Sequence, residues 1–125
     1  MPVPSRIVVS EQKDALSMEY QGDVRFNLPA EYLRVFSPSA EVRGHGKGQE
    51  VLQIGKRQVR IESIQQSGNY AIQITFDDGH DSGIFTWDYL FELGSKQTDN
   101  WANYTERLYQ ANQSRDPDTQ VVKLS

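Results

Sequence analysis

A run of alternating apolar residues, followed by a tight-turn pair, constrains the fold more than any other feature of the sequence. In GNYAIQITFDDGHDSGIF, apolar side chains recur at every second position from 70 to 76, which is typical of a strand with one buried face. The Asp-Gly pair at 78–79 favours a tight turn, and the apolar pair at 84–85 resumes the extended chain. The segment therefore predicts two strands joined by a short polar turn.

Similar alternation marks the beginning of the chain and a second internal segment. Apolar residues occur in RIVVS at 6–10 and alternate with polar residues at 16–20 and 24–28, around the turn QGD. This pattern predicts an opening meander of strands. The segment VLQIGKRQVRI at 51–61 predicts a further hairpin that turns at GKR.

Helical segments are expected between and after these strands. Pro29 suits the first turn of a short helix in PAEYLRVF, which must end near Ser37 because Pro38 disfavours helical geometry in the residue before it. The glycine-rich stretch EVRGHGKGQE at 41–50 then predicts an exposed loop.

Two more helices are predicted near the C-terminal end. Thr86 is suited to cap the helix WDYLFEL, and Gly94 is placed as its C-terminal stop. Trp101, Tyr104 and Leu108 recur at helical spacing within a second helix at 99–110. The elements together predict an α+β domain with a mostly antiparallel sheet, a short helix after the first meander and two C-terminal helices.

Length and composition limit the classes of protein. A chain of 125 residues is sufficient for one domain, which we place at 1–111, and the polar residues 112–125 are predicted to form a disordered tail. A net charge of -4 disfavours binding to nucleic acid. Because no apolar run approaches the roughly 18 residues of a membrane span, we expect a cytoplasmic protein that does not bind membranes.

The cysteine count and the two histidines define the metal chemistry that the sequence permits. With no cysteine, disulfides, thiolate nucleophiles and cysteine-based zinc or iron–sulfur sites are excluded. His80 in DDGHDSG is either a base or metal ligand, with a neighbouring aspartate, or part of a polar turn. Zinc held by His45, His80 and carboxylates is therefore the alternative to a chain without a cofactor.

The quoted segments also resemble a known family. LRVFSPSAEVRGHG and GNYAIQITFDDGHDSGIFTWDYLFELG, together with their separation, are similar to the gamma-butyrobetaine hydroxylase-like N-terminal domain family, a domain of unknown function. The resemblance runs from RIVVS to about Gly94 and is greatest to stand-alone bacterial members. Related domains precede iron- and 2-oxoglutarate-dependent hydroxylases or are attached to P-loop iron–sulfur carrier ATPases.

Within that family, some members hold zinc through a Cys-x-Cys-x-x-Cys segment and the histidine of the DGH turn. The resemblance places the three cysteine positions on Ser37, Ser39 and Val42, and the histidine on His80. Serine is a poor zinc ligand and valine is none, so the resemblance implies the fold but not the metal. We expect His80 to be held by a hydrogen bond to Ser37 or Ser39.

These observations favour a non-catalytic accessory module that binds another cytoplasmic protein. We therefore assign no catalytic residues. The competing hypotheses are the metal-binding protein that uses His45 and His80, and an unrecognised enzyme with a pocket around His80. The resemblance also allows a homodimer. The predicted interaction surface consists of Arg34, Ser37, Ser39, Glu41, Arg43, His45, Asp78, His80 and Asp81.

Overall fold

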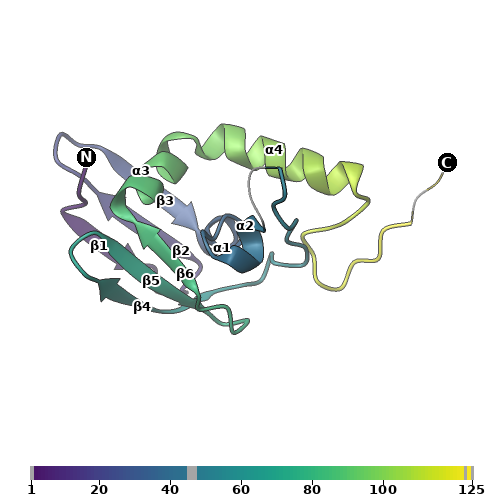
Figure 1. Ribbon diagram of the computed structural model, residues 1–125, viewed down its shortest axis with the longest axis horizontal. Helices are drawn as coiled ribbons and strands as arrows, with labels where there is room; N and C mark the ends of the chain where they lie inside the picture. Colours follow the sequence, from purple (N-terminus) through teal and green to yellow (C-terminus); the bar gives the residue numbers. More distant parts are fainter. Residues whose placement is uncertain (1, 45–47, 123, 125) are drawn as a thin grey trace.

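A computed structural model describes residues 2–44, 48–122 and 124. Strands and helices alternate in blocks along the chain (Figure 1). Their order is β1 (Arg6–Val9), β2 (Ala15–Glu19), β3 (Arg25–Pro29), α1 (Ala30–Val35), α2 (Ala40–Arg43), β4 (Ile61–Ser67), β5 (Ala71–Phe76), β6 (Gly83–Thr86), α3 (Trp87–Ser95) and α4 (Gln97–Gln110).

The strands form two antiparallel sheets, each made of three consecutive strands. The first has the order β1-β2-β3, with Met18 opposite Phe26, and the second has the order β4-β5-β6, with Ile72 opposite Phe85. The sheets occupy one end of the molecule, and α4 extends beyond them (Figure 1). The predicted α+β class, opening meander and two C-terminal helices are confirmed.

A single main core joins the two sheets to the helices. Apolar side chains of β2 and β5 alternate toward this core because successive residues of a strand point to opposite faces. The Tyr32 hydroxyl of α1 donates a hydrogen bond of 2.7 Å to the Leu93 carbonyl of α3. The completely buried members include Leu16, Met18, Leu28, Leu33, Ile61, Ile74, Phe76, Phe85 and Leu90.

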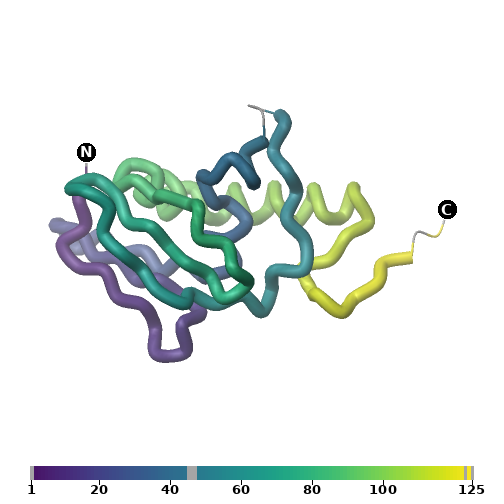
Figure 2. Tube along the Cα trace, turned by 60° about the horizontal axis from the view of Figure 1, so that its bottom comes forward, coloured from purple at the N-terminus to yellow at the C-terminus, as the bar shows by residue number. Residues whose placement is uncertain are grey.

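The segment at 51–60 corrects one prediction. No strand forms there among the described residues, so the hairpin predicted at GKR is wrong, and β4 begins only at Ile61. Backbone N–H groups of Gly55 and Arg57 instead donate to the carbonyls of Ser114 and Arg115. The segment and the C-terminal chain therefore run side by side (Figure 2).

The predicted loop at 41–50 is also partly wrong, because α2 includes its first three residues. Ser39 occupies the N-cap position of this short helix, but its side chain does not cap the helix. The Ser39 hydroxyl lies instead 3.3 Å from Nε2 of His80. N-cap serines usually accept from a backbone N–H in the first turn of their own helix, whereas the Ser39 hydroxyl contacts the distant His80 ring.

Ion pairs attach the residues after α4 to the domain. Arg115 makes two hydrogen bonds of 2.8 and 2.7 Å to the buried carboxylate of Glu31, and its guanidinium lies 5.0 Å from the centre of the Trp101 ring. These contacts hold Arg115 against the domain, while the predicted domain end at residue 111 and the disorder of the tail stay predictions. Among the described residues, no helix has the length and apolar character needed to cross a bilayer.

Gly94 is not the C-terminal stop of α3, since the helix continues to Ser95. A Cβ atom at this position would lie 2.3 Å from Cδ2 of Phe26. We expect Gly94→Ala to lower the free energy of unfolding by about 1–3 kcal/mol through this overlap. In an exposed helix the same change stabilises, so increased stability in urea unfolding would contradict the close approach.

Candidate functional site

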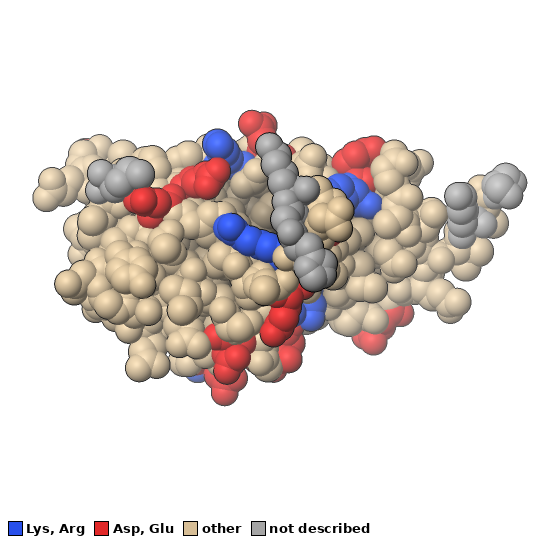
Figure 3. All heavy atoms as spheres, viewed as in Figure 1, with Lys and Arg blue, Asp and Glu red and all other residues tan. Residues whose placement is uncertain are grey.

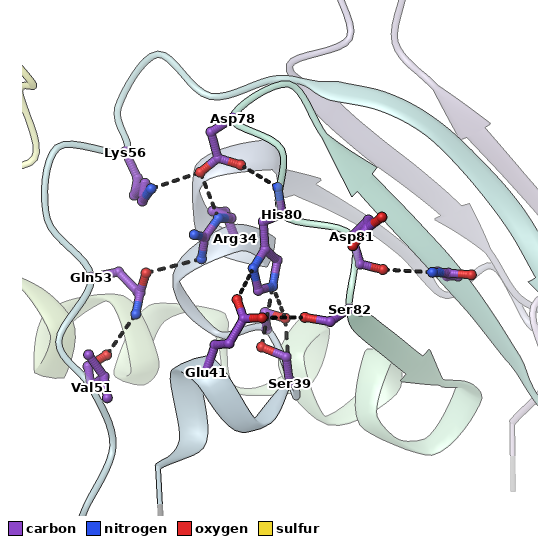
Figure 4. Close-up of polar contacts among 12 residues, drawn as sticks. Arg34, Ser39, Glu41, Val51, Gln53, Lys56, Asp78, His80, Asp81 and Ser82 are labelled. Atoms are coloured by element: carbon purple, nitrogen blue, oxygen red, sulfur yellow. Dashed lines mark hydrogen bonds and ion pairs between the residues drawn. The ribbon is translucent and has the colours of Figure 1, made fainter.

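The candidate site lies where the turn between β5 and β6 meets the chain between α1 and α2. Asp78-Gly79 forms this turn as predicted, with Gly79 at a φ of 89° that favours glycine. The Gly79 N–H donates to the Phe76 carbonyl over 3.0 Å. The turn thereby brings Asp78 and His80 over α1 and α2 (Figure 4).

His80 is the centre of a buried polar cluster. Its Nε2 atom lies 2.9 Å from Oγ of Ser37 and 3.3 Å from Oγ of Ser39. Its Nδ1 atom lies 3.2 Å from Oε2 of Glu41, and only 2% of the histidine side chain is exposed. The predicted hydrogen bond between His80 and these serines is confirmed.

The partners of His80 define its proton positions. Ionised Glu41 can only accept, so Nδ1 carries the proton and Nε2 accepts from the serine hydroxyls. Burial lowers the pKa of His80 below its ordinary value of 6.5, and the positive charge of Arg34 lowers it further. The carboxylates of Glu41 and Asp78 oppose this shift but do not reverse it. The imidazole is therefore neutral at pH 7.

A second polar group supports the other side of the turn. Nε of Arg34 lies 2.9 Å from Oδ2 of Asp78, and Nζ of Lys56 lies 2.7 Å from the same oxygen. Another nitrogen of Arg34 donates to Oε1 of Gln53 over 3.1 Å. Oδ1 of Asp78 accepts from the His80 N–H over 3.2 Å, so one carboxylate connects the two polar groups.

Asp78 is held in its charged form. Burial alone would raise its pKa, but hydrogen bonds from Lys56, the His80 N–H and Arg34 together lower the pKa to about 2. With 9% and 24% of their side chains exposed, Arg34 and Asp78 form a partly buried ion pair. The turn is therefore anchored by charge throughout the neutral range.

A glycine permits the close packing of Ser37. A Cβ atom on Gly83, the first residue of β6, would lie 2.4 Å from Oγ of Ser37. The serine hydroxyl consequently occupies the space that any other residue at 83 would fill. Gly83 carries no local sequence signal for the site, because its partner lies 46 positions earlier.

The structure divides the predicted interaction surface into buried and exposed residues. Four members are buried within the clusters described above, and therefore support the surface from below: Arg34, Ser37, Ser39 and His80. Glu41 and Asp78 join them from a more exposed position. His45 lies outside the described residues, and its predicted approach to His80 therefore stays a prediction.

Two other members of that surface have partners other than the His80 ring. The Arg43 guanidinium lies 4.8 Å from the centre of the Tyr89 ring. Asp81 contributes its backbone carbonyl, which accepts from Gln73 over 2.7 Å, while the residue is exposed (Figure 4). Lys56, which pairs with Asp78, and Gln53, which accepts from Arg34, were missed because the segment after α2 carries no local signal for either contact.

The residues of the cluster do not fit the zinc site that the family resemblance implies. Ser37 and Ser39 converge on Nε2 of His80, where thiolates would be needed, and Val42 supplies no ligand atom. Among residues 2–44 and 48–122, no three His, Asp or Glu side chains gather as a metal-binding group. The hydroxyls satisfy the imidazole by hydrogen bonds instead.

The order Ser37, His80 and Glu41 also has the connectivity of a nucleophile, base and orienting carboxylate. Ser37 is only 1% exposed, and its hydroxyl lies against Gly83 and is shielded from solvent. Its Oγ also accepts from the Ser39 N–H over 3.4 Å. The geometry therefore supports a structural role for this group.

The lowered pKa of His80 predicts a loss of stability in weak acid. The unfolded chain binds a proton as the pH falls through 6.5, whereas the folded chain resists it. The stability that neutral His80 contributes is fully present above pH 6.5. It decreases as the pH falls from 6.5 to the lower pKa of the folded state. We expect urea unfolding to show a larger decrease between pH 7.5 and 5.5 for the wild type than for His80→Gln. An equal decrease would contradict the assignment.

The fold and the buried cluster define a small α+β domain with a histidine-anchored turn. The chain belongs to the family of gamma-butyrobetaine hydroxylase-like N-terminal domains, whose model matches residues 7–91. No curated protein matches it. A solution structure determined by NMR is 50% identical, with a TM-score of 0.84 and coverage of 99% of this chain and 98% of that chain.

Two other solved structures extend the comparison. A second NMR structure is 40% identical, with a TM-score of 0.79 and coverage of 100% of this chain and 95% of that chain. A crystal structure from Acidithiobacillus ferrooxidans, of a protein of unknown function in the DUF971 family, is 31% identical. It has a TM-score of 0.60, and the alignment covers 73% of this chain and 91% of that chain.

Proposed function

We propose that the protein is a non-catalytic interaction module that binds another protein through the outer rim of the β5–β6 turn and α2. The observation that carries this proposal is that buried polar side chains hold the exposed β5–β6 turn in place. Both ring nitrogens of His80 and two guanidinium nitrogens of Arg34 contact residues that surround them. Such a preorganised surface binds with a smaller loss of conformational entropy.

The rim has a defined chemistry. Glu41 exposes 71% of its side chain and accepts from the exposed Ser82 hydroxyl over 3.4 Å. Asp77 and Asp81 are also exposed in the turn. On the face of the molecule shown in Figure 3, acidic side chains lie next to basic ones in several places. The acidic rim is complementary to a partner that presents Lys or Arg at the contact.

Site-specific photo-crosslinking tests this function in the native cell extract. A benzophenone amino acid at Asp81 is expected to capture one specific protein, because the Asp81 side chain is exposed and does not support the cluster. The matched control carries the same group at Glu62, an exposed position on β4. Equal capture at both positions, or none at Asp81, would contradict the proposal.

Two further measurements separate this function from its competitors. A folded His80→Ala variant is expected to lose the captured protein, since the turn loses its internal support. Metal analysis of the untagged protein tests the alternative that uses His45 and His80. Stoichiometric zinc or iron would overturn a function based on protein contacts alone.

A further inference from the structure

A hollow of about 900 Å³ lies between α2, the chain at 48–53 and the middle of α4. Its apolar lining includes Val35 and Val42, which are buried, and Leu52, which is half-buried. The volume is at the upper end of the range of about 300–1,000 Å³ that is usual for ligand pockets. The hollow therefore has room for several side chains of a ligand.

Two arginines line this hollow without a carboxylate partner among the described residues. Arg43 lies over the Tyr89 ring, and Arg107 donates a long hydrogen bond of 3.4 Å to the Glu50 carbonyl. Glu50 itself also lines the hollow and has interactions of its own. The guanidinium groups of Arg43 and Arg107 retain donors for an anionic ligand.

Two tyrosines fix the walls of the hollow. The Tyr104 hydroxyl donates to the Gln53 carbonyl over 2.7 Å, and the Tyr89 hydroxyl donates to the Phe36 carbonyl over 2.6 Å. Burial raises the pKa of Tyr104 to about 12, so it remains a donor at neutral pH. Because these bonds connect distant segments, the hollow is preformed and a ligand need not order it.

The local charge identifies the class of ligand. The whole chain carries a net charge of -4, yet two arginines that have no carboxylate partner in the described part of the chain flank an apolar floor here, with Glu50 as the acid of the lining. Guanidinium groups pair best with carboxylates or phosphates, while the floor needs an aliphatic group. Exposed Ala40 and Val51 line the hollow, so an extended chain has an accessible path across it.

On the basis of the proposed function, we propose that this hollow receives an acidic, apolar segment of the protein partner. A Glu or Asp of that segment pairs with Arg43 and Arg107, and an adjacent Leu or Val packs against Val42 and Leu52. The same partner then contacts the acidic rim through basic residues. The inference thus specifies a second, chemically distinct part of one interface.

An NMR titration of the full chain tests the hollow directly. The probe is acetyl-Leu-Glu-Leu-Glu-Leu-amide, and its control has Gln in place of both Glu residues. We expect the acidic peptide to shift the methyl signals of Val42 and Leu52 and the Nε–H signals of the two arginines. The Gln peptide should bind at least about tenfold more weakly, because it lacks charge-assisted hydrogen bonds.

Charge-matched variants make the result specific. Arg43→Gln/Arg107→Gln should weaken the acidic peptide by about tenfold or more, whereas Arg6→Gln/Arg25→Gln, on β1 and β3, should leave it unchanged. Equal binding of both peptides, shifts outside the hollow, or glutarate binding as tightly as the peptide would overturn the proposal.

The crosslinking experiment distinguishes failure here from failure of the proposed function. If Arg43→Gln/Arg107→Gln still captures the same protein through position 81 at full yield, the interaction module stands and the role of the hollow is wrong. If position 81 captures no protein, the proposed function itself fails.

Discussion

Replacing Asp78 with alanine is expected to lower the free energy of unfolding by about 3–5 kcal/mol, because a buried charge loses its partner. Arg34 exposes only 9% of its side chain, and Asp78 is the acid with which it pairs at 2.9 Å. Lys56 and the His80 N–H lose the same carboxylate. Urea unfolding at pH 7 measures the change.

A double-mutant cycle separates the ion pair from other effects of the substitution. Arg34→Met/Asp78→Ala should cost clearly less than the sum of the two single changes, since no unpaired charge then remains at the Arg34 position. The control is Asp81→Ala, which removes an exposed carboxylate from the same turn and should change stability by no more than about 0.5 kcal/mol. Additive effects of Arg34→Met and Asp78→Ala would contradict the role assigned to the pair.

The parts of the fold that depend on local periodicity could be predicted from the sequence. The alternation of residues 70–76 and the Asp-Gly pair were sufficient for β5 and the following turn, because both signals lie within a few residues of the structure that they determine. Thr86 accepts from the Tyr89 N–H over 3.1 Å, as expected for an N-cap. These elements required no knowledge of distant contacts.

The failures share a physical cause. VLQIGKRQVRI has the composition of a hairpin, but its backbone pairs partly with residues 114–115, about 60 positions away. The local sequence around Gly94 predicts the end of a helix. In the structure, glycine is needed there because a Cβ atom would overlap the Phe26 ring. Contacts between residues so far apart in the sequence do not affect the local hydrophobic or turn pattern from which these elements were predicted.

The centre of the site was predictable only through the family resemblance. It placed Ser37 and Ser39 opposite His80, and all three side chains meet as expected. The same resemblance put Arg34 and Asp78 on one predicted surface, but it did not predict the ion pair that joins them. Replacing thiolates by hydroxyls preserves polar atoms around the imidazole while changing metal ligation to hydrogen bonding.

Ending the chain at residue 111 is expected to destabilise the domain by about 2–4 kcal/mol. Glu31 exposes only 8% of its side chain and would lose both hydrogen bonds from Arg115. The backbone bonds from Gly55 and Arg57 to residues 114 and 115 would be lost as well. Thermal or urea unfolding of the shortened chain tests whether the domain ends at residue 111.

A chain that ends at residue 118 is the matched control for this deletion. It keeps Arg115 and the ion pair between Arg57 and Asp116 at 3.2 Å, and should differ from the full chain by no more than about 0.5 kcal/mol. Arg115→Ala in the full chain should reproduce most of the loss, because Glu31 keeps its burial without its partner. If the chain ending at 111 is as stable as the one ending at 118, the Glu31–Arg115 pair does not hold the C-terminal segment to the domain.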